Sequence, residues 1–240
     1  MADHEGAERR RRTLSFWQES ALLLVTALVL SFVVKTFFIQ AFYIPSGSME
    51  PGLKVDDRIL VQKVSYWGGG EPARGDVVVF EDPGGWLGAS ESAGPTNAFT
   101  TLMGKVGLYP SGGHLVKRVI GVAGDVIECC DDEGRLLVNG EPLEGDFTLN
   151  DFACDGPMVN QCERGWKAGP VPEGELFVMG DHRSASADSS DHMCRDTETD
   201  CTPGREFVPV DLVVGKVFAR VWPAGRMGWV RTPPTFEALD

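Results

Sequence analysis

The chain has 240 residues, of which 42% are hydrophobic and 24% charged, so it is long enough and apolar enough to fold around a core. Its formal net charge is −13, and because an acidic surface repels phosphate backbones, nucleic acid is disfavoured as a partner. The six cysteines lack the spacing of a zinc site, so we expect neither a metal nor another cofactor.

The first predicted element is a membrane-spanning helix over residues 16–43. An uncharged apolar run, Ala21 to Val34, forms its centre, with aromatic residues on both sides. The four arginines Arg9 to Arg12 precede it, and the positive-inside rule keeps such an end in the cytoplasm. We therefore expect a plasma-membrane protein with a cytoplasmic segment, residues 1–15, and an extracytoplasmic domain, residues 44–240. A cleaved signal peptide is the competing interpretation, but no clear small-x-small cleavage site follows the apolar run.

Beyond residue 43 the helical period gives way to short β-branched runs separated by turn residues. Because no helices that could connect parallel strands lie between these runs, we predict an all-β body of mainly antiparallel sheets in two subdomains. The predicted strands are Arg58–Val64, Asp76–Phe80, Leu115–Val122, Asp125–Glu128, Leu136–Val138, Leu176–Met179 and Val213–Val221.

Two stretches between the predicted strands look like inserted loops. Residues 81–113 are rich in Gly, Ser and Pro but also hold several large apolar residues. They form either a surface loop or a loop that dips into the bilayer interface. Residues 145–170 contain Cys154 and Cys162 and look like a loop stapled by a disulfide.

The cysteines all lie in the second half of the chain, and their number is even. This favours disulfides formed outside the cytoplasm. Cys194 and Cys201 are the simplest pair to predict because they close a short loop. The neighbours Cys129 and Cys130 are expected to bond to different partners. The full connectivity stays open at this point.

The segment from Pro45 to Pro51 offers a possible nucleophile, Ser48, which needs an activating base to attack an amide. His182 is the histidine in the most plausible site. The alternative base is Lys117, because burial in its apolar strand can lower the pKa of a lysine until the amine is neutral. Strand alternation points Lys117 and Arg118 to opposite faces, so one can lie inside while the other meets water or an acid.

Five segments follow one another behind the anchor: Pro45–Pro51, Asp57–Lys63, Gly75–Phe80, Lys117–Asp125 and Met179–Ser189. Together they resemble, in order, the sequence boxes of bacterial type I signal peptidases, which are serine peptidases that use lysine as the base. The order of the boxes behind a single anchor makes the resemblance specific from about residue 21 to residue 222. The acidic composition and the cysteine-bearing insertions are similar to those of actinobacterial members.

The resemblance implies a membrane-bound serine endopeptidase that removes N-terminal signal peptides from exported preproteins after small residues, as in Ala-x-Ala. It makes Ser48 the nucleophile and Lys117 the general base. It assigns the oxyanion hole to the Ser46 hydroxyl and the Ser48 N–H. The partners that it implies are signal peptides, the lipid bilayer and the protein-export translocon.

The resemblance also assigns supporting and substrate-binding residues. Ser186 would hydrogen-bond to the Lys117 amine and orient it. Asp181, Asp188 and Arg118 would form a supporting polar network. Shallow apolar pockets that accept small side chains would be lined by Ile44, Pro45, Met49, Leu53 and Val116.

The last box departs from the family's pattern. Asp188 and Ser189 are followed by Ser190 where arginine is usual. We therefore expect Arg118 or Arg183 to compensate as the partner of Asp188. His182 stands where asparagine is more common, and we interpret it as a structural residue.

Two other functions share some of these features. A self-cleaving repressor with a Ser–Lys pair needs a DNA-binding domain and a cytoplasmic body, which the anchor, the charge and the cysteines oppose. A non-catalytic, membrane-tethered β domain for adhesion or scaffolding fits the organisation of the chain. It predicts that an Ala-x-Ala peptide is not hydrolysed.

Overall fold

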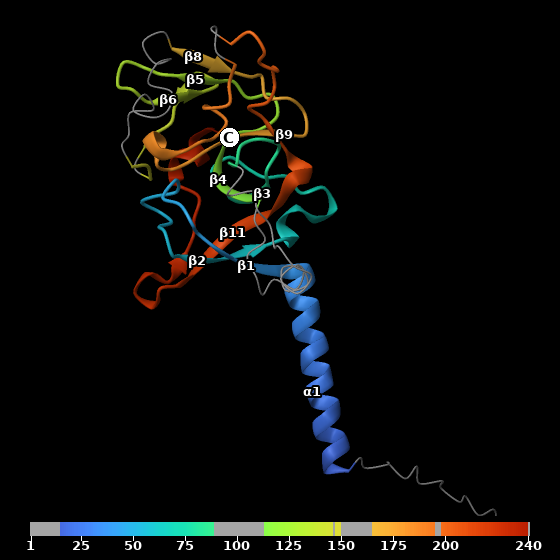
Figure 1. Cartoon of the computed structure of the whole chain (residues 1–240). Coiled ribbons are helices and arrows are strands. Elements are labelled where there is room, and N and C mark those ends of the chain that lie inside the picture. Colours follow the sequence, from blue (N-terminus) through green and yellow to red (C-terminus); the bar gives the residue numbers. More distant parts are fainter. Residues whose placement is uncertain (1–14, 89–112, 146, 150–164, 195–197, 240) are drawn as a thin grey trace, which may run out of the picture.

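The computed structural model describes residues 15–88, 113–145, 147–149, 165–194 and 198–239. They form a β-rich body that stands on one long helix (Figure 1). The strand ladders within these residues are antiparallel, as predicted, and one isolated bridge is parallel.

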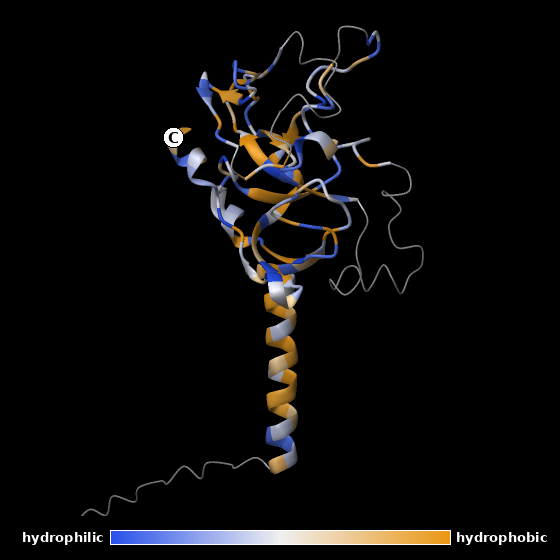
Figure 2. Cartoon of the chain, turned by 90° about the vertical axis from the view of Figure 1, so that its left-hand side faces the viewer, coloured by the Kyte–Doolittle hydropathy of each residue, from blue (hydrophilic) through white to orange (hydrophobic). Residues whose placement is uncertain are grey.

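The helix α1 (Phe16–Val33) is the one predicted to span a membrane. Ser15 caps its start, because the Ser15 side chain accepts a hydrogen bond from the Gln18 N–H and the Gln18 side chain accepts one from the Ser15 N–H. None of its residues is buried, and Figure 2 shows a largely hydrophobic rod. Among the described helices it is the one long and apolar enough to cross a bilayer.

The helix ends earlier than the predicted anchor of residues 16–43. A single π-helical turn, η1 (Val34–Phe38), follows it, and Ile39–Tyr43 forms strand β1. This end of the prediction was wrong. The residues of β1 continue the apolar run in sequence, but they pair with β2 (Arg58–Gln62), and this pairing satisfies the hydrogen bonds of their backbone groups.

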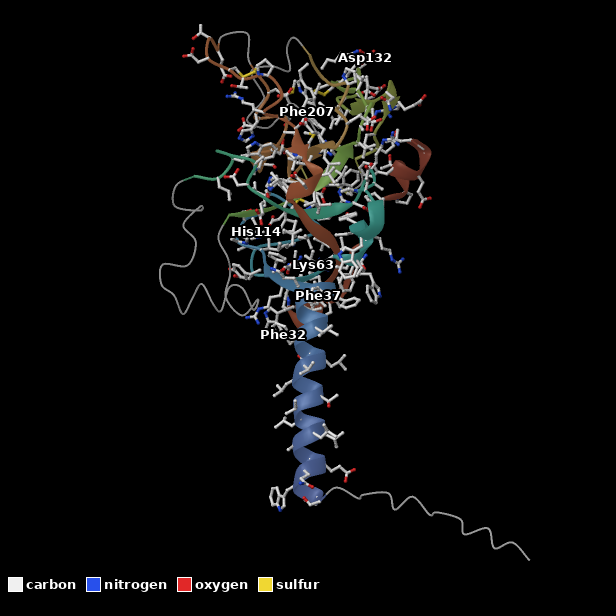
Figure 3. The ribbon with its side chains drawn as sticks, turned by 90° about the vertical axis from the view of Figure 1, so that its right-hand side faces the viewer. Phe32, Phe37, Lys63, His114, Asp132 and Phe207 are labelled. Atoms are coloured by element: carbon white, nitrogen blue, oxygen red, sulfur yellow. A yellow bond between two sulfur atoms is a disulfide. The ribbon has the colours of Figure 1, made fainter. Side chains whose placement is uncertain are left out.

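The junction between α1 and the body is short and fixed. The Lys63 N–H, just after β2, donates to the Phe38 carbonyl over 3.0 Å. The Phe38 ring packs on the Trp67 ring with 5.5 Å between centroids. Figure 3 shows Phe37 and Lys63 at this junction. The sheet therefore begins directly where the helix ends.

Ten further strands complete the body. They are β3 (Val77–Glu81), β4 (His114–Gly121), β5 (Ile127–Cys129), β6 (Leu136–Val138), β7 (Glu141–Pro142), β8 (Trp166–Ala168), β9 (Glu175–Met179), β10 (Val208–Pro209), β11 (Val213–Trp222) and β12 (Gly228–Trp229). The larger sheet has the order β1-β2-β11-β3-β4-β9-β10, with β12 paired to β11, and the smaller has the order β7-β6-β5-β8. The larger sheet lies next to α1 and the smaller one at the far end (Figure 1).

All of the predicted strands are present, with ends shifted by at most two residues. The prediction missed β1 and the short strands β7, β8, β10 and β12. The remaining elements are short 3-10 helices: η2 (Val64–Gly69), η3 (Arg183–Ala185), η4 (Val210–Leu212), η5 (Ala224–Arg226) and η6 (Pro234–Leu239).

The two predicted insertions lie partly outside the described residues. In the first, residues 81–113, the described start packs on the body: Trp86 is 7% exposed and stacks on His192 with 4.4 Å between ring centroids. The second, residues 145–170, is not wholly a loop, because its end supplies β8 to the smaller sheet. Cys154 and Cys162 lie outside the described residues.

The structure pairs four cysteines. Cys194 bonds to Cys201, as predicted. Cys129 and Cys130 bond to each other, so the expectation of different partners was wrong. Their Cα atoms lie 3.0 Å apart, which brings the two adjacent sulfur atoms within bonding distance.

One apolar cluster lies beneath the connection between β1 and β2. Each of its fully buried aliphatic side chains contributes about 1.5–3 kcal/mol through removal from water. The packing of this cluster therefore stabilises the connection between β1 and β2. Its buried members are Ile44, Met49, Leu53, Ile59, Val61, Val77, Val79 and Val217.

Candidate active site

The connection between β1 and β2, residues 44–57, carries the predicted nucleophile, Ser48, and is called the nucleophile loop below. The β1–β2 ladder holds both of its ends, and the Ile44 N–H donates to the Asp57 carbonyl over 2.9 Å. At its entrance the Tyr43 phenol donates to the Asp56 carboxylate over 2.5 Å, and this hydrogen bond raises the pKa of Tyr43. The loop is thus closed at its base.

Lys117 comes from β4, which lies between β3 and β9 in the larger sheet. It pairs with Val78 on β3, and its side chain is buried, with the residue 4% exposed. Its Nζ lies 3.0 Å from the Ser48 Oγ. The fold therefore brings together two groups that are far apart in sequence.

Two donors lie close to the Ser48 hydroxyl. The Ser46 Oγ is 3.3 Å from the Ser48 Oγ. Within the described residues, the Ser48 N–H donates no hydrogen bond. The Ser48 carbonyl is held from the other side by the His182 N–H over 3.0 Å. A hydroxyl and a backbone N–H can therefore donate to a negative oxygen that forms beside Ser48.

His182 supports the backbone of the nucleophile loop. Besides its bond to the Ser48 carbonyl, its ring Nδ1 lies 3.3 Å from the Gly47 carbonyl. Both contacts are to main-chain atoms of the loop. They agree with the interpretation of His182 as a structural residue.

Arg118 and Asp181 form a buried ion pair on the other face of β4. Arg118 Nε and Nη2 donate to the two Asp181 carboxylate oxygens over 2.7 Å and 2.6 Å, and Nη1 donates to the Gly75 carbonyl over 2.8 Å. The Phe147 ring covers the guanidinium at 4.8 Å. A bidentate pair of this kind fixes geometry because both groups are planar. Arg118 thus meets an acid, as the alternation of the strand predicted.

Asp188 is satisfied by a different residue than expected. Its Oδ1 accepts from the Ser190 hydroxyl over 2.5 Å and from the Ser190 N–H over 3.1 Å, and its Oδ2 accepts from the Gly180 N–H over 2.9 Å. Arg118 is committed to Asp181. The expectation that Arg118 or Arg183 must compensate was wrong, because Ser190 itself supplies two donors at the position of the missing arginine.

Ser186 is buried next to Ser48 but does not bond to Lys117. Its Oγ has no hydrogen-bond partner among the described residues, so the expected contact with the Lys117 amine is not formed. A Cβ added to Gly180 would lie 2.3 Å from the Ser186 Oγ and 2.4 Å from the Ser48 carbonyl oxygen. The Ser186 side chain therefore points at the Gly180 backbone, and only glycine at 180 allows this close packing.

The predicted substrate-binding residues divide into two groups. Ile44, Met49 and Leu53 are buried in the apolar cluster beneath the nucleophile loop, and Val116 packs against that cluster. Pro45 is exposed. Within the described residues, no group of three or more His, Cys, Asp or Glu side chains could hold a metal ion.

Sequence reasoning missed three residues that hold the nucleophile loop. Asp57, fully buried, accepts from the Lys54 N–H over 2.8 Å and lies 3.0 Å from Arg226 Nη1. Arg220 Nη1 donates to the Gly52 carbonyl over 2.5 Å. Both arginines come from the end of the chain, where no local pattern links them to the loop. Asp57, at the start of the second sequence box, was the one available signal.

Comparisons with known proteins add to this geometry. A family model described as "Signal peptidase, peptidase S26" matches residues 17–222. A signal peptidase I from Mycobacterium tuberculosis is 39% identical, with 96% of this chain and 83% of the relative covered. A probable signal peptidase I-2 from Synechocystis is 31% identical, with 93% and 82% covered. A crystal structure of a signal peptidase I from Enterococcus faecalis shares 21% identity at a TM-score of 0.34, with 61% of this chain and 96% of that chain covered.

Proposed function

Because this chain belongs to the signal peptidase family S26, and is therefore a serine endopeptidase that cleaves signal peptides from preproteins, we propose that Ser48 is its nucleophile and Lys117 its general base. The observation that carries this proposal is the 3.0 Å contact between the Ser48 Oγ and the Nζ of the buried Lys117. Burial favours the uncharged form of an amine, and an uncharged amine can accept a proton.

The first half of the reaction forms an acyl-enzyme. The Ser48 Oγ attacks the carbonyl carbon of the scissile bond, and its proton passes to the Lys117 Nζ. The negative oxygen of the tetrahedral intermediate accepts hydrogen bonds from the Ser48 N–H and the Ser46 hydroxyl. The C–N bond then breaks, and Lys117 gives its proton to the leaving amine of the mature protein.

The second half releases the signal peptide. Lys117, again uncharged, takes a proton from water, and the resulting hydroxide attacks the ester carbonyl on Ser48. The same oxyanion donors stabilise the second intermediate. The C–O bond to Ser48 breaks and Lys117 returns the proton to the Ser48 oxygen. The protons balance over the cycle, and no cofactor is needed.

The supporting groups act by holding other residues of the site in position. Arg118, Asp181 and Asp188 hold the segments on both sides of Gly180, and through the His182 N–H they hold the Ser48 carbonyl. Shallow pockets beside Ile44, Pro45, Met49, Leu53 and Val116 would accept small side chains and reject bulky ones, which favours Ala-x-Ala sites.

The enzyme acts at a membrane, and its orientation is part of the proposal. Residues 1–15 would lie in the cytoplasm, α1 and η1 would anchor the chain in the lipid bilayer, and residues 44–240 would lie outside. The support is the arginine cluster before α1 and the short chain between α1 and Ser48. Preproteins would reach the site as they leave the export translocon. A protease added to spheroplasts should digest the body and spare an N-terminal tag; the reverse pattern would contradict this orientation.

The function is tested by cleavage of an Ala-x-Ala precursor by the full chain in detergent. Ser48→Ala should lower kcat by at least about 10⁴-fold, as loss of a nucleophile does in other serine peptidases. The melting temperature of the variant should stay close to that of the wild type. Full activity in Ser48→Ala would refute the assignment. His182→Ala tests the rival base, and the proposal predicts that its activity still rises toward alkaline pH.

A further inference from the structure

A pocket lies beside the nucleophile loop. It has a volume of about 340 Å³, and its wall includes Gly52 and Leu53 of that loop. Trp229 and Arg231 form another part of the wall, and Arg220 lies between the two. Arg220 also donates to the Gly52 carbonyl. The pocket is thus in direct contact with the segment that carries Ser48. The proposed function uses Leu53, Arg118 and Asp181 of its wall, but not Arg220, Trp229 or Arg231.

The arginines at this pocket outnumber the carboxylates. Its wall holds Arg118, Arg220 and Arg231 and one carboxylate, Asp181. Arg220 also lies 3.9 Å from Asp57, which is outside the wall and is shared with Arg226. Arginine pairs strongly with carboxylates and phosphates because its planar group offers several donors at once. Because Arg220 shares the Asp57 carboxylate with Arg226, it keeps donor capacity for a second anion.

Arg231 adds a charge with no ion-pair partner in the described part of the chain. The third arginine in the wall, Arg118, is neutralised by Asp181. Three arginines against one aspartate in the wall leave two positive charges here, although the chain as a whole carries −13. This local reversal of charge favours an anion of one or two charges.

An apolar rim flanks the pocket. The hairpin that joins β11 to β12 exposes Trp222, Met227 and Trp229, of which Trp229 is 71% exposed. This hairpin, dark red in Figure 1, lies at the end of the body where α1 meets β1. Tryptophan is enriched where one part of a side chain meets lipid and another meets water. The rim therefore suits an anion that arrives as part of a membrane surface.

We propose that the pocket lined by Arg220 and Arg231 binds the phosphate of an anionic phospholipid headgroup, with Trp222, Met227 and Trp229 in the interface beside it. The inference rests on the proposed membrane anchoring. Because Arg220 also holds the Gly52 carbonyl, a bound headgroup orders the nucleophile loop and raises the rate of cleavage. The acidic remainder of the body would by itself be repelled by such lipids, so the pocket accounts for any attraction.

The test uses the full chain reconstituted in phosphatidylcholine vesicles with increasing shares of phosphatidylglycerol. The wild type should cleave a peptide substrate faster as phosphatidylglycerol is added. In Arg231→Gln the share needed for half of this increase should rise about fivefold, the effect of one basic residue at an anionic surface. Activity in phosphatidylcholine alone should not change. The matched control is Lys167→Gln, which removes one positive charge from an exposed side chain on β8, and it should behave as the wild type.

Three outcomes would overturn the inference. One is a wild type that is active but not stimulated by phosphatidylglycerol, and another is equal stimulation of Arg231→Gln and the wild type. The third is equal stimulation by inorganic phosphate in detergent, which would make the ligand a free anion instead of a lipid. The proposed reaction is judged separately, because Ser48→Ala should be inactive in every vesicle, whatever its composition.

Discussion

The proposed nucleophile and the proposed base come from two regions that are held in different ways. Lys117 belongs to β4, which has a hydrogen-bonded ladder on each side, with β3 and with β9. Ser48 belongs to a loop, residues 44–57, which is held by single polar contacts from residues far along the chain. Backbone ladders fix a strand over its whole length, whereas a loop is only as well placed as the few groups that contact it.

This difference indicates how the two regions should respond to change. Substitutions in the core around β4 should lower the stability of the fold and leave the reaction of folded molecules intact. Substitutions among the groups that hold the loop should move Ser48 and lower kcat. The predictions below test this contrast, beginning with the point where the two regions meet.

The largest effect is expected for Lys117→Met. Methionine keeps the length and apolar stem but has no amine, so kcat should fall by about 10⁴-fold or more. The melting temperature should stay the same or rise, because methionine avoids the cost of burying a polar amine. Rate and thermal unfolding are measured together, with Lys167→Met on the surface as control. A Lys117→Met enzyme within about tenfold of the wild type would contradict the assignment of the base.

Gly180→Ala should have the next largest effect on rate. The added Cβ would lie 2.4 Å from the Ser48 carbonyl oxygen, so the nucleophile loop must shift. A displacement of about 1 Å at a reacting group can cost about 10²-fold in rate. The crowding should also lower the free energy of unfolding by about 1–3 kcal/mol. Gly225→Ala is the control, because its Cβ would meet open space, and its kcat should not change. Equal kcat values in the two variants would show that the close packing at Gly180 does not position Ser48.

Ile120→Val tests the strand side of the contrast. Ile120, on β4, is fully buried in the apolar cluster that the two sheets share. Loss of one methylene there should lower the free energy of unfolding by about 0.5–1.5 kcal/mol. The kcat of the folded enzyme should stay the same. Urea unfolding and substrate cleavage at neutral pH provide both values. A clear fall in kcat would mean that the position of Lys117 depends on the packing of Ile120 and not on the strand ladders alone.

The smallest effect is expected at the far sheet, in the turn after β5. Burial raises the pKa of Asp131, but hydrogen bonds from the Arg135 backbone and side chain and the Arg135 charge outweigh it, so the folded pKa is lowered. The unfolded chain then binds the proton more readily. The stabilisation by Asp131 is thus complete at a pH above the pKa of the unfolded chain, about 3.9. It is lost as the pH falls through the lower pKa of the folded protein.

Asp131→Asn should therefore lose less stability than the wild type between neutral and acidic pH, in urea unfolding at a series of pH values. Its exposed neighbour offers a matched control, since Asp132→Asn makes the same change of charge and should follow the wild type. Neither variant should change kcat, because the turn is remote from the site. Identical pH dependence in the two variants would show that the Arg135 contacts contribute nothing.

The sequence predicted what depends on local pattern. Runs such as Val77–Phe80 alternate or cluster apolar residues in a way that favours strands, and the ordered boxes identified Ser48 and Lys117 as a pair. It missed β1 because an apolar strand that directly follows an apolar helix has no boundary in composition.

The sequence could not predict the contacts that depend on how the folded backbone places each residue. Ser190 replaces an arginine through two short hydrogen bonds, which depends on the turn between it and Asp188. Arg220 reaches Gly52 from a strand near the other end of the chain. Ser186 lies against Gly180 and not against Lys117. Each depends on backbone placement that only the folded sheet determines.

The central claim, that Ser48 and Lys117 act as one unit, is tested most directly by a double-mutant cycle. The kcat values of Ser48→Ala, Lys117→Met and the double variant are measured on one precursor at one pH. Because groups that act together are strongly non-additive, the double variant should be no slower than the slower single variant. Losses that multiply in the double variant, or a single variant that keeps its activity, would contradict the account.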